Sequence, residues 1–349
     1  MDRNLSRRHI LRLTAAGTGV IALGGLRIRG VYAAPPPLEK KDTYKVGFSQ
    51  VEMNNPWRIA QTESMQAEAE RLGYEMVYTD AAGDEAKQIQ DVNDMISQQV
   101  DLIFLAPRSE KPLAQAVLDA KAAGIPVILL DRNVDNEIAK PGEDFVTFIG
   151  SDFIQEGARA AEWLARTMGG EATIIELEGT TGSSPAMDRQ KGFRDYLAGT
   201  FTGHPSGTPV AAPTAGFPGM TVVASQTGDF ARDEGRKVFE TLYQANPEAT
   251  AVYAHNDEMA IGAILALEAQ GKVPGTDVII VSIDGSKDAL QAIIDGKLGA
   301  TVESNPRFGP KAFETLAAYA NGDDIPEKII NPDKFFDSSN AEAEVGNAY

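Results

Sequence analysis

Five short apolar segments of this sequence are each followed by side chains with strong hydrogen-bonding groups. In chain order, these are Asn54-Asn55 with Trp57-Arg58, Asp131-Arg132, Glu178 with Asp188-Arg189, His255-Asn256-Asp257, and Asp284. Carboxylate and amide oxygens accept hydrogen bonds, and guanidinium and amide N–H groups donate them. The combination therefore suits hydroxyl groups, which do both. The apolar C–H face of a sugar ring packs on an aromatic ring such as Trp57. Together these residue types indicate a carbohydrate-binding site.

Each of these residues also has a purely structural interpretation. An Asp after a strand is commonly a helix cap or a turn residue, and the alternative for Trp57 is a place in the hydrophobic core. His255 stands directly before the helix start at Asn256-Asp257. That position favours a capping or core role over the role of a general base. The recurrence of such groups after five segments favours a shared site, because ligands bind at the carboxyl ends of strands in open α/β sheets.

The composition excludes several kinds of chemistry. The 349 residues include no cysteine, which rules out disulfides, thiolate metal sites and a cysteine nucleophile. Only His204 and His255 follow residue 33, which leaves no histidine-rich metal cluster. Gly179–Ser184 lacks the lysine of a phosphate-binding loop. We therefore expect no enzyme activity, no cofactor and no metal. A net charge of −18 also argues against nucleic acid as a partner.

Residues 1–33 have the pattern of a signal peptide. Arginines at positions 3, 7, 8 and 12 precede a weakly apolar run from Leu13 to Leu26. Val31-Tyr32-Ala33 then fits a cleavage site. Ser6–Arg12 resembles the twin-arginine export motif, and a Sec signal with a basic start is the alternative. Either route predicts a protein that leaves the cytoplasm.

Beyond residue 33, short apolar strands alternate with helical patterns. The predicted strands are Tyr44–Val51, Glu75–Thr79, Leu102–Ala106, Val127–Leu130, Val146–Gly150, Thr173–Leu177, Val222–Gln226, Ala251–Ala254, Val278–Ile283 and Ala300–Glu303. The predicted helices are Asp84–Gln99, Pro112–Ala123, Gln155–Met168, Phe230–Gln244, Met259–Gln270 and Lys287–Asp295. Such alternation predicts an α/β fold with parallel sheets, and ten strands divide more naturally into two sheets than one.

Two further segments lack any hydrophobic period. Gly199–Gly219 is rich in Gly, Pro, Ala and Thr, which predicts an exposed flexible loop. Asp337–Tyr349 has the composition of a polar tail.

Five motifs resemble the ribose/galactose type of periplasmic binding protein, also called type I, which serves ABC sugar importers. They are Gly47–Gln50, Leu130–Arg132, Asp188–Phe193, Tyr253–Met259 and Ser282–Gly285. The resemblance covers nearly the whole chain after the signal peptide. It implies two Rossmann-like lobes with parallel sheets, joined by a three-segment hinge that encloses the sugar. It also implies a monomer in the periplasm, with a monosaccharide ligand and a membrane ABC permease as partners.

The resemblance also carries lobe boundaries and site residues onto this sequence. The first lobe would comprise 44–145 plus about 285–303, and the second 146–284 plus about 304–336. The ligand-binding residues would be Asn54, Asn55, Trp57, Arg58, Asp131, Arg132, Arg189, Asn256 and Asp284. A sugar or signal-molecule sensor that feeds a membrane receptor is the alternative function, because the same fold serves it. A transcription regulator would need a DNA-binding headpiece where this chain has a signal peptide.

The presence of three arginines among the predicted site residues favours a five-membered sugar ring. Arg58, Arg132 and Arg189 supply up to three guanidinium forks, whereas Trp57 is the only aromatic residue among the site motifs. A pyranose binder of this fold usually places its flat ring between two aromatic side chains. We therefore expect a furanose, and the resemblance implies galactofuranose as the example.

Overall fold

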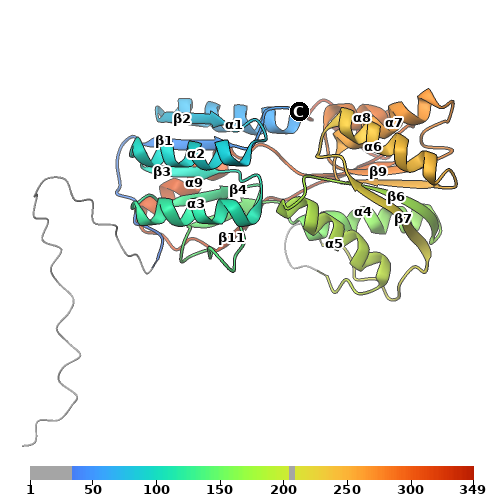
Figure 1. Ribbon diagram of the computed structural model, residues 1–349, viewed down its shortest axis with the longest axis horizontal. Coiled ribbons are helices and arrows are strands. Elements are labelled where there is room, and N and C mark those ends of the chain that lie inside the picture. Colours follow the sequence, from blue (N-terminus) through green and yellow to red (C-terminus); the bar gives the residue numbers. More distant parts are fainter. Residues whose placement is uncertain (1–33, 204–208) are drawn as a thin grey trace, which may run out of the picture.

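The computed structural model describes residues 34–203 and 209–349, which form two α/β lobes lying side by side along the long axis of the molecule (Figure 1). The predicted signal peptide, residues 1–33, lies outside the described residues. Within the described part of the chain, no helix is both long and apolar enough to cross a membrane.

The first lobe is built on a six-stranded, fully parallel sheet in the order β11-β5-β4-β3-β1-β2. Its strands are β1 (Lys45–Gln50), β2 (Glu75–Asp80), β3 (Leu102–Leu105), β4 (Val127–Leu130), β5 (Thr147–Gly150) and β11 (Lys328–Ile330). Its helices are α1 (Pro56–Leu72), α2 (Glu85–Ser97), α3 (Glu110–Ala122) and α9 (Gly309–Asn321). β3 and β4 are buried along their whole length, as expected of strands covered by helices on both faces.

The second lobe has a six-stranded sheet in the order β12-β10-β9-β8-β6-β7, with only the β10–β12 pair antiparallel. Its strands are β6 (Glu171–Glu178), β7 (Gly219–Thr227), β8 (Ala251–Ala254), β9 (Ile279–Asp284), β10 (Ala300–Glu303) and β12 (Phe335–Asp337). Its helices are α4 (Phe153–Thr167), α5 (Ser184–Ala198), α6 (Arg232–Ala245), α7 (Asp257–Ala269), α8 (Lys287–Ile294) and α10 (Ala341–Glu344).

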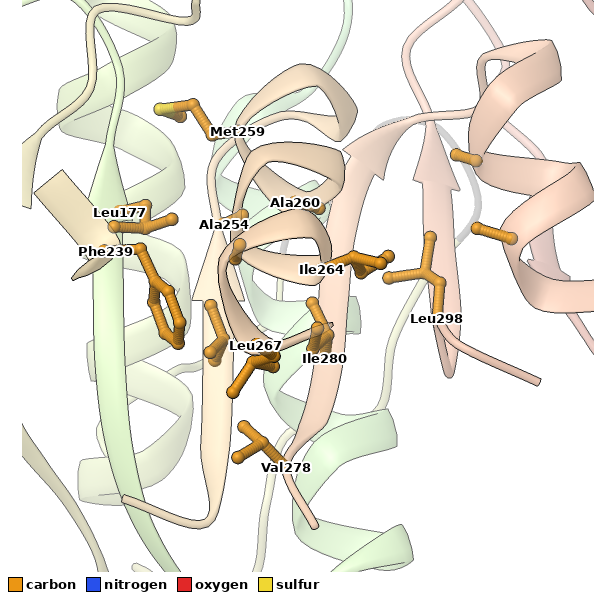
Figure 2. Close-up of a cluster of buried hydrophobic side chains, with 14 of the residues drawn as sticks. Leu177, Phe239, Ala254, Met259, Ala260, Ile264, Leu267, Val278, Ile280 and Leu298 are labelled. Carbon is orange, nitrogen blue, oxygen red and sulfur yellow. The ribbon is translucent and has the colours of Figure 1, made fainter. Parts of the chain in front are cut away.

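One of the two cores of the second lobe lies beneath α7 (Figure 2). Ile264 and Leu267 of this helix lie against Ile280 of β9, and Leu177 and Phe239 continue the cluster toward β6 and α6. α7 has few polar residues on any side, as expected of a helix that is buried almost all round. This packing fixes the start of α7, where His255 and Asn256 stand.

The α/β class and all ten predicted strands are confirmed. The two short strands β11 and β12 and the helices α1, α5, α9 and α10 were not predicted. β11 and β12 are only three residues long, and α1 and α5 have no clear apolar stripe in their sequence.

The predicted lobe boundaries are wrong at both ends. β5 was assigned to the second lobe but pairs with β4 in the first sheet. β10 was assigned to the first lobe but pairs with β9 in the second sheet. β11, within the segment 304–336 that was assigned to the second lobe, pairs with β5 in the first sheet. β5 and β10 each pair with the strand that precedes them in the chain, as consecutive strands most often do. The chain therefore crosses between the lobes after β5, after β10 and between β11 and β12, which gives three crossings.

The described residues of the predicted loop are mostly exposed, but two apolar residues of the loop are buried, and the predicted tail packs on the second lobe. Phe201 and Val210, at either side of the gap in the described residues, are buried in the second lobe, and the Val210 N–H donates to Gln155 Oε1 at 3.3 Å. In the tail, α10 packs on α8, and the Lys287 N–H donates to the Tyr349 carbonyl oxygen at 3.0 Å. Both segments lack a hydrophobic period, but each contains isolated apolar side chains that pack on the second lobe.

Candidate functional site

A small cavity, with a volume of about 30 Å³, lies between the two lobes. Its lining residues are Asn55, Trp57, Arg58, Asp131, Arg132, Pro185, Arg189, Phe230, Asn256 and Asp284. The structure thus brings eight of the nine predicted site residues around one cavity. Asn54 does not line it and is exposed. The small size of the cavity suits a single small molecule rather than a chain of sugars.

Asp131 follows the end of β4 in the first lobe, Asp284 is the last residue of β9 in the second lobe, and both have positive φ angles, 63° and 132°. Both are almost fully buried. Residues other than glycine rarely adopt such φ values, and those that do cluster at functional sites. Burial raises the pKa of Asp284 well above its ordinary value, and the neighbouring Arg189 partly opposes this rise.

In the first lobe, Arg58 contacts two other residues that line the cavity, Asp131 and Trp57. Its Nη2 lies 2.7 Å from Asp131 Oδ2, and its guanidinium carbon lies 4.7 Å from the centre of the Trp57 ring. Trp57 in turn donates from Nε1 to the Ser304 carbonyl oxygen at 2.6 Å and packs edge-on against Phe308. Trp57 therefore belongs to both the cavity wall and the core, so the two interpretations from sequence are not exclusive.

Arg189 is held from three directions at the second-lobe side of the cavity. Its Nε donates to Glu156 Oε2 at 2.7 Å, its Nη1 to the His255 carbonyl oxygen at 2.6 Å, and its Nη2 to Asp284 Oδ1 at 3.3 Å. Burial lowers the pKa of Arg189, but the carboxylates of Glu156 and Asp284 outweigh it and raise the pKa above the ordinary value. The guanidinium is therefore a fixed positive charge in the cavity wall.

Arg132 is as deeply buried but far less completely bonded. Its Nη1 donates to the Arg108 carbonyl oxygen at 3.1 Å, whereas Asp131 Oδ2 lies 3.9 Å from its Nε. Burial, with the nearby charge of Arg58, lowers the pKa of Arg132 to about 9, and Asp131 and Glu52 partly oppose this. Arg132 thus has N–H groups left over for a ligand.

The asparagines at the site also cap helices. Asn55 Oδ1 accepts from the Arg58 N–H at the start of α1, and Asn256 Oδ1 accepts from the Met259 N–H at the start of α7. Asn256 Nδ2 donates to the Phe230 carbonyl oxygen at 3.0 Å. The capping interpretation therefore holds for both residues, although both line the cavity.

Sequence reasoning missed Pro185 and Phe230 in the lining. Phe230 lies with positive φ beyond the end of β7, where no site residue was predicted. The guanidinium carbons of Arg132 and Arg189 lie 5.6 and 5.8 Å from its ring centre. A Cβ at Gly179 would come within 1.9 Å of the ring, so only glycine leaves room for it. The prediction that Trp57 is the only aromatic residue at the site is wrong.

His255 lies behind the cavity rather than in its wall. Its side chain is fully buried, Nε2 lies 3.0 Å from Glu176 Oε1, and Nδ1 accepts from the Gly179 N–H at 3.3 Å. This is the predicted core role, and the residue supports Arg189 through its carbonyl oxygen. Among the described residues, no group of three or more His, Asp or Glu side chains is arranged to hold a metal ion.

Comparison with known proteins places this two-lobed architecture and its cavity in a family. The model of the periplasmic binding protein domain matches residues 46–324. Over 308 residues the chain is 35% identical to the galactofuranose-binding protein YtfQ of Escherichia coli (strain K12), covering 87% of this chain and 91% of that protein.

Two solved structures are similarly close. The binding protein of the arabinose ABC transporter from Shewanella sp. ANA-3, bound to α- and β-L-arabinofuranose, has a TM-score of 0.77 and 36% identity, covering 87% of this chain and 95% of that chain. A Mycobacterium smegmatis protein in complex with β-D-fucofuranose has a TM-score of 0.78 and 39% identity, covering 87% and 94%. With the family match over most of its length, the chain belongs to the family of periplasmic binding proteins.

Proposed function

We propose that the protein captures a monosaccharide in furanose form between its two lobes and delivers it to the membrane permease of an ABC importer. The observation that carries this proposal is the cavity, where acceptors from Asp131 and Asp284 face donors from Arg58, Arg132 and Arg189. Binding would close the lobes by stabilising one of two arrangements related by a hinge motion.

The furanose preference rests on the relatives and on the arginines. The names of the relatives cite galactofuranose, arabinofuranose and fucofuranose. Phe230 adds a second aromatic ring to the cavity, but guanidinium groups lie over both rings, Arg58 over Trp57 and Arg132 and Arg189 over Phe230. The rings are thus less available to stack on a flat pyranose, and the guanidinium forks would meet the hydroxyls of a puckered ring.

Ring size is testable with sugars that cannot change their ring. We expect methyl furanosides of galactose, arabinose and fucose to raise the midpoint of thermal unfolding and to give heat on isothermal titration. The matched methyl pyranosides should do neither. The reverse preference, or a six-membered ring in the cavity of a crystal structure with galactose, would overturn the furanose proposal while leaving sugar binding intact.

The remaining parts of the proposal have their own measurements. The chain would work as a monomer in the periplasm and would not transform its ligand, so light scattering should give the mass of one chain. Sugar recovered after long incubation should be chemically unchanged. Turnover of any sugar would instead indicate an exported enzyme on this fold.

A further inference from the structure

Glu52, which was not among the predicted site residues, has one carboxylate oxygen without a protein partner. The residue follows β1 and is 5% exposed. Its Oε2 accepts a hydrogen bond from Asn54 Nδ2 at 2.9 Å. Its Oε1 is buried and has no hydrogen-bond partner among the residues that the structure describes. A buried carboxylate oxygen left in this state is costly.

The nearest cation to this oxygen is Arg132 of the cavity wall. Arg132 Nη2 lies 4.0 Å from Glu52 Oε1, which is too far for a hydrogen bond. Arg132 is 1% exposed, and its Nε is likewise without a hydrogen-bond partner in the described part of the chain. A buried acceptor without a hydrogen-bond partner in the described part of the chain therefore faces the Nη2 side of a guanidinium that lines the cavity.

A short chain of hydrogen bonds holds Glu52 in this position. Asn55 Nδ2 donates to Asn54 Oδ1 at 3.0 Å, and Asn54 Nδ2 donates to Glu52 Oε2. Asn55 is itself the N-cap of α1. The carboxylate is thus tied to the start of the helix that carries Trp57 and Arg58, which explains how Asn54 can matter to the site without lining it.

The 4.0 Å separation fits one bridging hydroxyl group. An oxygen about 2.8 Å from both Arg132 Nη2 and Glu52 Oε1 would subtend an angle of roughly 90° between them. A hydroxyl can accept from the guanidinium and donate to the carboxylate at the same time. We propose that Glu52 is a specificity-determining residue, whose Oε1 accepts a hydrogen bond from the sugar hydroxyl to which Arg132 donates. This inference rests on the proposed sugar-binding function.

Replacement of Glu52 by Gln removes this acceptor with little change of shape. Asn54 Nδ2 requires an acceptor at the Oε2 position, so the Gln side chain would place its oxygen there and turn its NH2 group toward Arg132. Two donors would then face each other. We expect Glu52→Gln to weaken binding of the best methyl furanoside by about 10- to 100-fold, the range for a hydrogen bond to a charged group. Glu143→Gln, on the exposed surface of the same lobe, is the matched control and should bind as the wild type does.

The decisive measurement is isothermal titration of both proteins with the single-deoxy analogues of that furanoside. In the wild type, loss of the bridging hydroxyl should weaken binding by about 10- to 100-fold. In Glu52→Gln, loss of that hydroxyl should cost much less, whereas the cost at every other position stays the same. If each deoxy analogue loses the same affinity in Glu52→Gln as in the wild type, the carboxylate contacts no sugar hydroxyl, for example because water bridges the gap. That result would overturn the proposal.

A crystal structure of the wild type with the furanoside gives a second readout that does not depend on the stability of the variant. The proposal requires a sugar oxygen within about 3.2 Å of both Glu52 Oε1 and Arg132 Nη2, and a structure with no such oxygen contradicts it. If the wild type binds no sugar at all, the proposed function fails, and this outcome is distinct from failure of the Glu52 assignment.

Discussion

At the scale of single residues, the site depends on two carboxylates that the strands deliver into a buried cavity. Asp131 is paired with Arg58 and Asp284 with Arg189. Each pair therefore brings an acceptor and a donor to the cavity from one lobe. A ligand hydroxyl that meets both members would bind more strongly than it would bind either alone.

We predict that Asp131→Asn and Asp284→Asn each cost about 2–4 kcal/mol of sugar affinity, because each replaces an acceptor oxygen with a donor and leaves a buried arginine poorly compensated. Isothermal titration measures the loss, and circular dichroism confirms that the variants fold. Wild-type affinity in either variant would remove that aspartate from the binding site.

Trp57 provides a direct optical report of ligand binding. The two tryptophans of the chain are Trp57 in the cavity wall and Trp163 in the core of the second lobe. We predict that sugar changes the fluorescence of the wild type and of Trp163→Phe, but not that of Trp57→Phe. A sugar-dependent change that survives in Trp57→Phe and disappears in Trp163→Phe would place the ligand elsewhere.

At the scale of elements, the close approach of α4 and α5 positions Arg189. A Cβ at Gly192 would lie 1.9 Å from the Ile154 carbonyl oxygen, and a Cβ at Gly157 would lie 2.1 Å from the Arg189 carbonyl oxygen. The two helices thus meet through glycines at a distance that no other residue allows. This contact lets Glu156 of α4 reach Arg189 of α5.

We predict that Gly192→Ala lowers the free energy of unfolding by about 1–3 kcal/mol, the usual cost of overpacking, and also weakens sugar binding. The binding loss follows because α5 must move away from α4 and carry Arg189 with it. Urea unfolding and titration check the two effects. Gly346→Ala, where a Cβ meets no atom within 4 Å, is the control. An unchanged affinity in a destabilised Gly192→Ala protein would show that α5 does not position the arginine.

At the scale of the whole molecule, the two lobes also touch outside the cavity. The Glu110 N–H, at the start of α3, donates to the Gly182 carbonyl oxygen at 3.1 Å, and the Asn133 N–H donates to Ser184 Oγ at 2.8 Å. Burial, followed by the charges of Asp188 and Asp135, raises the pKa of Glu110 to about 7. Asp188 belongs to the second lobe, so part of this rise depends on the contact between the two lobes.

Closure is therefore expected to depend on pH. A pKa that is higher in the closed form means that protonation of Glu110 favours closure. The favourable contribution is complete below the ordinary pKa of 4.5 and is lost as the pH rises through about 7. We predict that sugar affinity falls between pH 5 and pH 8 in the wild type, and that the fall is smaller in Glu110→Gln. Titrations across this range, with Glu143→Gln as the control, measure the effect. Identical pH profiles in all three proteins would exclude Glu110 as the cause.

Much of the fold could be predicted from the sequence because its signals are local. The apolar runs that became β3, β4 and β8 are buried along their whole length, and such runs mark internal parallel strands wherever they occur. The lobe boundaries could not be predicted in this way. β5 and β10 have the composition of any buried strand, and only pairing with β4 and β9 assigns each to its sheet.

By itself, the sequence determined the fold class, the places of ten strands along the chain and the polar groups that stand at their ends. These follow from residue type and from the rule that parallel strands end at one edge of a sheet. Only the tertiary structure decided which of these groups share a cavity, because distance between side chains depends on how the two lobes meet. In the folded chain, Asn54 does not line the cavity, whereas Phe230 and Pro185 do. The unsatisfied oxygen of Glu52 lies beside Arg132. Phe230 follows a strand like the others, yet its place depends on the room left by Gly179, some 50 residues earlier in the chain, and no local pattern of residues encodes such a contact.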